Sequence, residues 1–420
     1  MKIKNDPVYV RRRRIVLTVA VAIAVVLVLL VGSLVVANEG EPPAEAASST
    51  GTAAEPTQPT EVETPAPEDS PATSQGKSAD SAETDLVRVQ RLTGEMAPKS
   101  VVASAKGQVF AQNMMYRHSV SVFTADGALQ KTIDDSVELA DFGIEGHPGT
   151  SKGAPVEMAF SPDGETAWVS NYSMYGENFL PEGKDACAGP EGISNSYVYE
   201  IDTTTLEIDD VVEVGAVPKY VAATPDGKHV LVTNWCSMDL SVIDVAKGKV
   251  TSTIPLGGDN PRGIEVSPDS STAYVALMGA DRTVAVDLDS GAVDADFTDT
   301  GDGPRHLVLS PEGEHLYVTN NNSGTVSEVD TATGEVTREV AVGTQPRSMT
   351  MSPDGGALYV VNYDDATMSK VATDDFEVIQ TVETDPHPIG ITYEPTQERV
   401  WVACYGGSII VFDDSRTATE

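Results

Sequence analysis

The sequence predicts an all-β fold, a seven-bladed β-propeller that occupies residues 85–420. The first observation is a proline that returns at intervals of 43, 43, 42 and 42 residues over the last four intervals. The second is a segment that follows each proline in the same register. The third is the turn-forming residues that separate short runs of Val, Leu, Tyr and Thr. A period of about 40–45 residues with several strands per unit is typical of propeller blades. The seven anchor prolines are Pro98, Pro155, Pro218, Pro261, Pro304, Pro346 and Pro388.

Each repeat unit is predicted to form four antiparallel strands. In the unit that starts at Pro304, we expect strands at 306–310, 315–320, 325–330 and 336–342. Pro-Glu-Gly, Asn-Ser-Gly and Thr-Gly lie between these strands and supply the constrained or positive φ angles that tight turns need. A four-stranded sheet alone leaves two apolar faces uncovered, so neighbouring copies must cover them in a closed ring.

The unit after Pro388 supplies only three strands before the chain ends. Residues 85–97 precede Pro98 in the way that the fourth strand of other units precedes the next anchor proline. We therefore expect 85–97 to complete the last blade and close the ring. Deletion of 85–97 should then destabilise the whole propeller, whereas deletion of 40–80 should not.

The repeated segment carries a family resemblance. Tyr-Val-Thr-Asn stands at 317–320, and the variants LVTN, WVSN and YVVN stand at 231–234, 168–171 and 359–362. With these motifs the chain resembles the YVTN-type β-propeller repeat family, the YncE-like proteins, over nearly all of residues 85–413. The resemblance implies an extracytoplasmic seven-bladed propeller that binds or scaffolds. Related propellers include lactonases and cofactor-binding subunits of redox enzymes.

The first 84 residues divide into three segments. Residues 1–14 form a basic tail, and 15–37 form an uncharged apolar run long enough to span a bilayer with its basic flank in the cytoplasm. A cleaved signal peptide is the alternative. Residues 38–84 are an acidic linker rich in Pro, Ala, Ser and Thr, which is expected to be disordered. We expect a single-pass cell-membrane protein with the propeller outside the cytoplasm.

Charge and cysteine content limit the classes of partner. The formal net charge of -37 disfavours nucleic acid, because an acidic surface repels phosphate. Three cysteines are too few for a disulfide-built scaffold. Cys404 takes the place of the asparagine that ends the second strand elsewhere, and we expect it to be a buried free thiol.

Two units carry insertions. Residues 134–154 lengthen a connection between blades, and 172–196 lengthen a loop between strands two and three of the next blade. Both are expected on the same face of the propeller, where loops on a rigid scaffold often bind partners, although neutral surface elaboration is the alternative. The candidate partner-contact residues are Tyr172, Tyr175, Phe179 and Trp235. Cys187 and Cys236 lie in neighbouring loops and are candidates for a disulfide.

A cation follows the anchor proline in five of the seven units, and we expect these side chains to surround the channel mouth on the face of the insertions. The five residues are Lys99, Lys219, Arg262, Arg305 and Arg347. Together they predict a site that attracts small anions such as carboxylates or phosphates. The alternative is that each cation pairs with a carboxylate of a neighbouring blade.

Asparagine and histidine residues supply further candidates on the same face. Asn171, Asn234, Asn320 and Asn362 end the second strand of their units, either to hold the following turn or to contact a ligand. His118, His147, His306 and His387 map to this face and leave a divalent metal ion possible, although no fixed ligand spacing supports one. No resident cofactor is predicted.

No nucleophile elbow, HExxH motif or complete phosphate-binding loop is present in the sequence, and fold alone names no chemistry. We therefore expect a non-catalytic binding or scaffold module for an extracytoplasmic protein or a small anion. The alternatives are a lactonase-like or metal-dependent hydrolase at the channel mouth and a redox subunit that holds a cofactor.

Overall fold

The computed structural model describes residues 80–180, 187 and 192–417. All of these belong to the second of two compact units, Gln75–Glu420. The predicted basic tail, the predicted anchor at 15–37 and most of the predicted linker lie outside the described residues. Among the residues that are described, no helix has the length and apolarity needed to cross a membrane.

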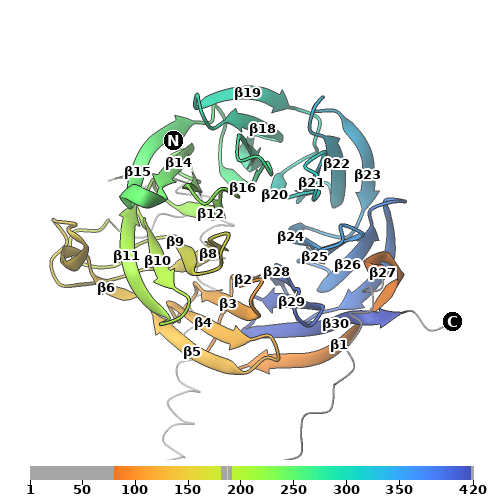
Figure 1. The fold of residues 1–420 in the computed structure, drawn as a ribbon, viewed down its shortest axis with the longest axis horizontal. Coiled ribbons are helices and arrows are strands. Elements are labelled where there is room, and N and C mark those ends of the chain that lie inside the picture. The colour runs from red at the N-terminus through yellow and green to blue at the C-terminus, as the bar shows by residue number, and fades with distance from the viewer. Residues whose placement is uncertain (1–79, 181–186, 188–191, 418–420) are drawn as a thin grey trace, which may run out of the picture. The chain divides into compact units, whose positions relative to one another are not determined.

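The described part of the chain contains seven four-stranded antiparallel sheets arranged in a ring (Figure 1). The first sheet contains β2 (Ser100–Ala103), β3 (Gln108–Asn113), β4 (Ser119–Thr124) and β5 (Leu129–Asp134). The second contains β8 (Pro155–Phe160), β9 (Thr166–Asn171), β10 (Tyr197–Asp202) and β11 (Glu207–Glu213). The third contains β12 (Pro218–Ala223), β13 (His229–Asn234), β14 (Asp239–Asp244) and β15 (Lys249–Pro255). The next three are β16 (Pro261–Val266), β17 (Thr272–Leu277), β18 (Arg282–Asp287) and β19 (Ala292–Phe297); β20 (Pro304–Leu309), β21 (His315–Asn320), β22 (Thr325–Asp330) and β23 (Val336–Ala341); and β24 (Pro346–Met351), β25 (Ala357–Asn362), β26 (Thr367–Ala372) and β27 (Glu377–Glu383). The seventh joins β28 (Pro388–Glu394), β29 (Arg399–Cys404) and β30 (Ser408–Thr417) to β1 (Thr84–Thr93).

The anchor prolines begin the strands nearest the centre of the ring, from β8 onward, and the fourth strands lie at its outside (Figure 1). Burial follows this order. In β21 five of six residues are buried, whereas in the outer strand β23 half-buried and exposed residues alternate. The predicted turns are present in this blade, and Gly313, Gly324 and Gly334 adopt φ angles of 79°, 75° and 74°. Glycine suits these positions because a side chain disfavours positive φ.

Apolar side chains fill the space between each pair of neighbouring sheets. Five apolar clusters each contain residues from two adjacent sheets of the ring. One cluster contains Tyr359 of β25 and Val402 of β29. Another contains Trp401 of β29 and Val101 of β2, so the last sheet packs against both its neighbours. Each sheet is thus stabilised by apolar area that only its neighbours cover.

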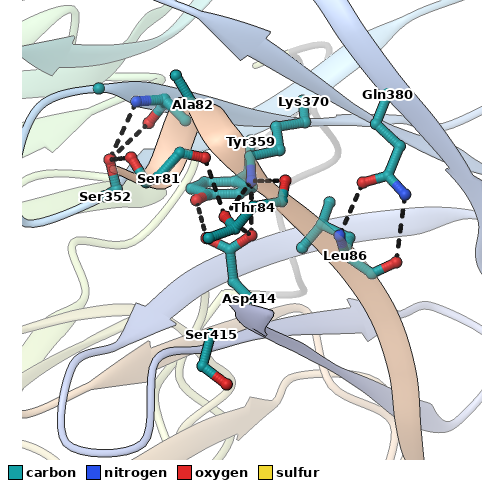
Figure 2. A network of polar contacts seen from close by, with 12 residues as sticks. Ser81, Ala82, Thr84, Leu86, Ser352, Tyr359, Lys370, Gln380, Asp414 and Ser415 are labelled. Carbon is teal, nitrogen blue, oxygen red and sulfur yellow. Dashed lines mark hydrogen bonds and ion pairs between the residues drawn. The ribbon is translucent and has the colours of Figure 1, made fainter. Parts of the chain in front are cut away.

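The seventh sheet combines both ends of the described chain. β1 pairs antiparallel with β30, from Thr84 opposite Thr417 to Thr93 opposite Ser408. β1 ends at Thr93, short of the predicted residue 97, and the next residue, Gly94, has a φ angle of 145°. Figure 2 shows how the neighbouring blade holds β1. Gln380 accepts a hydrogen bond from Leu86 N at 2.8 Å and donates one to Leu86 O at 3.3 Å.

A buried ion pair lies beside this junction (Figure 2). Lys370 of β26 and Asp414 of β30 are 0% exposed in their side chains, and Nζ lies 2.6 Å from Oδ1. Lys370 Nζ also donates to Thr84 O and Thr84 Oγ1, both at 2.8 Å. The Tyr359 hydroxyl donates to the other carboxylate oxygen of Asp414. The pair therefore connects three strands, β26, β30 and β1.

The two insertions lie side by side. The first forms β6 (Ser136–Glu138), the 3-10 turn η2 (Leu139–Phe142) and β7 (Thr150–Lys152), with β6 paired to β7. The backbones of Lys152 and Tyr175 exchange two hydrogen bonds of 2.7 Å. Three shorter 3-10 turns are also present, namely η1 (Ser81–Glu83), η3 (Val245–Lys247) and η4 (Met278–Ala280).

Candidate functional site

The five cations that follow the anchor prolines line one pocket, called here the mouth pocket. Its volume is about 610 Å³, within the range of small-molecule sites. Four of the cations lie on the innermost strands of their blades, and Lys99 directly precedes the innermost strand β2. Lys99, Lys219, Arg262 and Arg305 are between 3% and 7% exposed, and Arg347 is half-buried. The sequence thus located the charged part of this pocket.

A second repeat position contributes the other side chains of the mouth pocket. This position is the residue directly after the end of the second strand, and its occupants are mostly aromatic or Met. The contributors are Met114, Tyr172, Trp235, Met278, Tyr363 and Tyr405, together with Met115 and the innermost-strand residue Ile389. Sequence reasoning missed Met114, Met278, Tyr363 and Tyr405. The repeat register contained the signal, because each follows an asparagine or its equivalent at the end of a second strand.

Aromatic rings support several of the cations. Lys219 Nζ lies 4.3 Å from the ring centre of Tyr172 and 5.1 Å from that of Trp235. The guanidinium carbon of Arg262 lies 5.5 Å from the Trp235 ring, and that of Arg347 lies 4.2 Å from the Tyr363 ring. Cation–π contacts of this kind stabilise cations that have left water.

Hydrogen bonds satisfy these cations to different degrees. Lys99 Nζ lies 3.4 Å from Glu157 Oε1, so this cation pairs with a carboxylate of the next blade. Arg305 Nε donates to Arg347 O at 3.0 Å. Arg262 Nε is buried and has no hydrogen-bond partner among the described residues. The expectation of pairing with a neighbouring carboxylate therefore fits Lys99 but leaves Arg262 unexplained, since an unsatisfied buried donor is costly.

Burial and repulsion between the cations lower the pKa values of Lys99 and Arg305. Burial lowers the pKa of Lys99 to about 7, the Glu157 carboxylate opposes this shift, and Arg262 and Arg305 add to it. Burial, followed by the charges of Arg262 and Arg347, lowers the pKa of Arg305 below its ordinary value. The cations thus destabilise one another, and an anion among them would relieve that repulsion.

His306 lies in a separate cavity of about 510 Å³ lined by the innermost strands, not in the mouth pocket where sequence reasoning placed it. Its Nδ1 accepts a hydrogen bond from Met349 N at 3.3 Å, and its ring lies 5.0 Å from that of Tyr220. Burial, with Arg305 as the next cause, lowers the pKa of His306 to about 3. Burial also raises the pKa of Glu265, in the same cavity, to about 8.

Of the two roles expected for the strand-end asparagines, their side chains are placed to hold the following turn. Asn171, Asn234, Asn320 and Asn362 are 0% exposed, and none of them lines the mouth pocket. Their amide groups hold the blade instead, as when Asn362 Nδ2 donates to Thr367 Oγ1 and Ser369 Oγ, both at 3.0 Å. The position therefore serves the repeat.

The other histidine candidates lie apart. His118 Nδ1 lies 2.7 Å from Gly153 O, His147 stacks on Phe179 with 3.8 Å between ring centres, and His387 stacks on Tyr363 at 4.6 Å. Within 80–180, 187 and 192–417, no three His, Cys, Asp or Glu side chains form a group that could hold a metal ion. The described residues thus do not bring the four histidines together as ligands.

The aromatic partner-contact candidates divide into two pairs. Tyr172 and Trp235 are 6% and 9% exposed and line the mouth pocket, so they do not form an exposed contact surface. Tyr175 and Phe179 are half-buried within the second insertion, where His118 packs against Tyr175. Because Tyr172 and Trp235 pack against Lys219 and Arg262, little of either ring is accessible to a partner protein at the surface.

The predicted disulfide between Cys187 and Cys236 is present. It ties the second insertion to the loop that follows β13, next to Trp235 of the mouth pocket. Cys404 is a buried free cysteine, as predicted, and burial raises its pKa to about 12. The thiol is therefore protonated and unreactive at neutral pH.

Comparison with known proteins agrees with the topology. The model of the family described as "Lactonase, 7-bladed beta-propeller" matches residues 184–338, less than half of the chain. The chain is a seven-bladed β-propeller. No curated protein matches it. A solved chain of Kuenenia stuttgartiensis hydrazine synthase is similar, with a TM-score of 0.61, 19% identity, and coverage of 78% of this chain and 98% of that chain. At this identity the likeness shows the fold alone.

Proposed function

We propose that this propeller is a binding module that holds a small anion in the mouth pocket. The observation that carries the proposal is the convergence of five cations on one pocket, in which Arg262 Nε is buried and has no hydrogen-bond partner in the described part of the chain. A buried guanidinium donor without an acceptor is costly, and an anion that accepts from it offsets that cost.

Long-range electrostatics support the same proposal. The chain carries a formal net charge of -37, so its surface as a whole repels anions. Five cations gathered at one place create a local field of opposite sign, and the low-dielectric walls of a cleft focus that field. Binding of an anion should therefore be confined to the mouth pocket.

The experiment is calorimetric titration of the full chain with propane-1,2,3-tricarboxylate. The variant R262A/R305A/R347A should lose at least about 100-fold in affinity, since each charge-assisted hydrogen bond contributes about 1.5–3 kcal/mol. The control variant K106A/K228A/K247A removes three exposed cations outside the pocket, with side chains 54%, 74% and 58% exposed. Equal loss in both variants, or no loss in the first, contradicts the proposal.

Affinity should also depend on pH through Lys99. With its pKa near 7, Lys99 gains a proton as the pH falls from 8 to 6, and the pocket gains a positive charge. Anion affinity should rise over this window. His306, with a pKa near 3, stays neutral there and does not contribute. In K99M the rise should be absent, and a rise of the same size in K99M contradicts this assignment.

A second candidate function is hydrolysis of a lactone, which the match of residues 184–338 to the lactonase model favours. Near pH 7 a fraction of Lys99 is the neutral amine and can accept a proton from an attacking water. The water oxygen would bond to the carbonyl carbon, the bond from that carbon to the ring oxygen would break, and Lys99 would pass its proton to the ring oxygen, so that a hydroxy acid is released. Arg262 and Arg305 would stabilise the carbonyl oxyanion.

Titration of the acid released from glucono-δ-lactone tests this second candidate. Turnover that K99M abolishes while tricarboxylate binding persists would support an enzyme. No turnover by a chain that binds the tricarboxylate supports the binding module alone.

The setting of this function is also part of the proposal. The YVTN-like motifs at 168–171, 231–234, 317–320 and 359–362 support a YncE-like propeller. The apolar run at 15–37 supports an anchor in the cell membrane, and the Cys187–Cys236 disulfide supports a domain outside the cytoplasm, where disulfides persist. An extracytoplasmic protein that presents an acidic side chain is the alternative ligand. Membrane fractionation with protease accessibility of the propeller tests this topology.

A further inference from the structure

The mouth pocket is polarised around the axis of the ring. Four consecutive blades, from β12 to β27, contribute Lys219, Arg262, Arg305 and Arg347, and three of these blades also contribute Trp235, Met278 and Tyr363. The last blade contributes Ile389 and Tyr405, and the first contributes Met114, Met115 and Lys99. In Figure 1 the strands β28 and β2 lie together on one side of the ring, across from β16 and β20.

The side of the mouth pocket that the first and last blades line carries little net charge. Lys99 is the cation there, and Glu157 Oε1 lies 3.4 Å from its Nζ. The remaining lining of this side is Ile389, Met114, Met115 and Tyr405. Side chains of this kind favour an apolar or aromatic group, and Met packs readily against aromatic rings.

We propose that the ligand of the mouth pocket is an aromatic polycarboxylate rather than a simple inorganic anion. Its carboxylates lie against Arg262, Arg305 and Arg347, and its ring lies against Met114 and Met115. This inference rests on the proposed function and specifies its ligand class. Arg262 Nε supplies an unused donor on the charged side, and a pocket of about 610 Å³ accommodates a ring with several carboxylates.

The experiment compares two probes of equal charge by calorimetry on the full chain. Benzene-1,3,5-tricarboxylate carries its three carboxylates on an aromatic ring, and propane-1,2,3-tricarboxylate carries them on an aliphatic chain. The aromatic probe should bind at least tenfold more tightly, because burial of its ring adds to the same electrostatic attraction. In M114S/M115S this preference should fall below about threefold, because the aromatic probe should lose more affinity than the aliphatic probe.

The control variant is M238S, which removes a methionine that is 37% exposed and does not line the pocket. It should retain the tenfold preference. Equal affinity for the two probes in the native chain overturns this inference and leaves the proposed function standing. Failure of both probes to bind overturns the proposed function itself, and the inference falls with it.

Discussion

The Lys370–Asp414 pair beside the junction of β1 and β30 gives the sharpest prediction about the fold. In K370M the carboxylate of Asp414 loses its counter-charge while the residue stays 2% exposed. The methionine also leaves Thr84 O and Thr84 Oγ1 without their 2.8 Å donor. Removing one member of a buried ion pair costs about 3–5 kcal/mol, because the remaining charge is uncompensated.

The pair itself is less favourable than its 2.6 Å separation suggests. Burial lowers the pKa of Lys370 and raises the pKa of Asp414, so desolvation opposes the attraction between the charges. The double variant K370M/D414N, which has no charge to bury, should therefore be more stable than K370M by at least about 1 kcal/mol.

Urea unfolding of the full chain, followed by circular dichroism, measures these differences. The matched control is K247M, because Lys247 Nζ lies at the same 2.6 Å from Asp244 Oδ2 but its side chain is 58% exposed. Exposed pairs contribute at most about 1 kcal/mol. If K370M and K247M cost the same free energy of unfolding, the reasoning from burial is refuted.

Three further predictions concern stability. Deletion of residues 84–93 should lower the melting temperature of the whole propeller, because β1 supplies one edge of the seventh sheet, and an unchanged value would contradict this. Burial raises the pKa of Asp135 to about 8, above its ordinary 3.8, so the folded state holds this proton more tightly and stability should fall as pH rises from 4 to 8. In D135N the fall of the urea midpoint between pH 4 and pH 8 should be smaller than in the native chain but not absent, because burial also raises the pKa of Glu265 to about 8; a fall of equal size would refute the assignment. G343A should destabilise by about 1–3 kcal/mol, because an added Cβ lies 2.5 Å from Cγ of Asn362, whereas G406A meets nothing within 4 Å and is the control; equal urea midpoints would contradict this steric argument.

The sequence predicted the repeat architecture because local and global signals agree. Turn glycines, strand-end asparagines and anchor prolines recur in one register, so the same pattern of signals is found in several blades. The charged half of the mouth pocket was predictable for the same reason, since a position in the repeat maps to a fixed place on the ring. The disulfide followed from the adjacency of two loops.

Other features depend on packing that the register alone does not specify. The sequence left open whether the asparagines hold the following turn or contact a ligand, and packing decides this, because their amides point to hydroxyls such as Ser369 Oγ. His306 follows a pocket cation, yet alternation along the innermost strand directs it into the neighbouring cavity. The apolar side of the mouth pocket was not predicted, because Met114 and Tyr405 carry no charge that marks their shared position in the repeat.

Anomalous diffraction from a crystal of the protein soaked in selenate tests the central claim most directly. The account predicts an anomalous peak in the mouth pocket, with selenate oxygens within hydrogen-bond distance of Arg262 Nε. Peaks that lie only at other surfaces, with the mouth pocket empty at a saturating selenate concentration, would contradict the claim that this pocket binds anions.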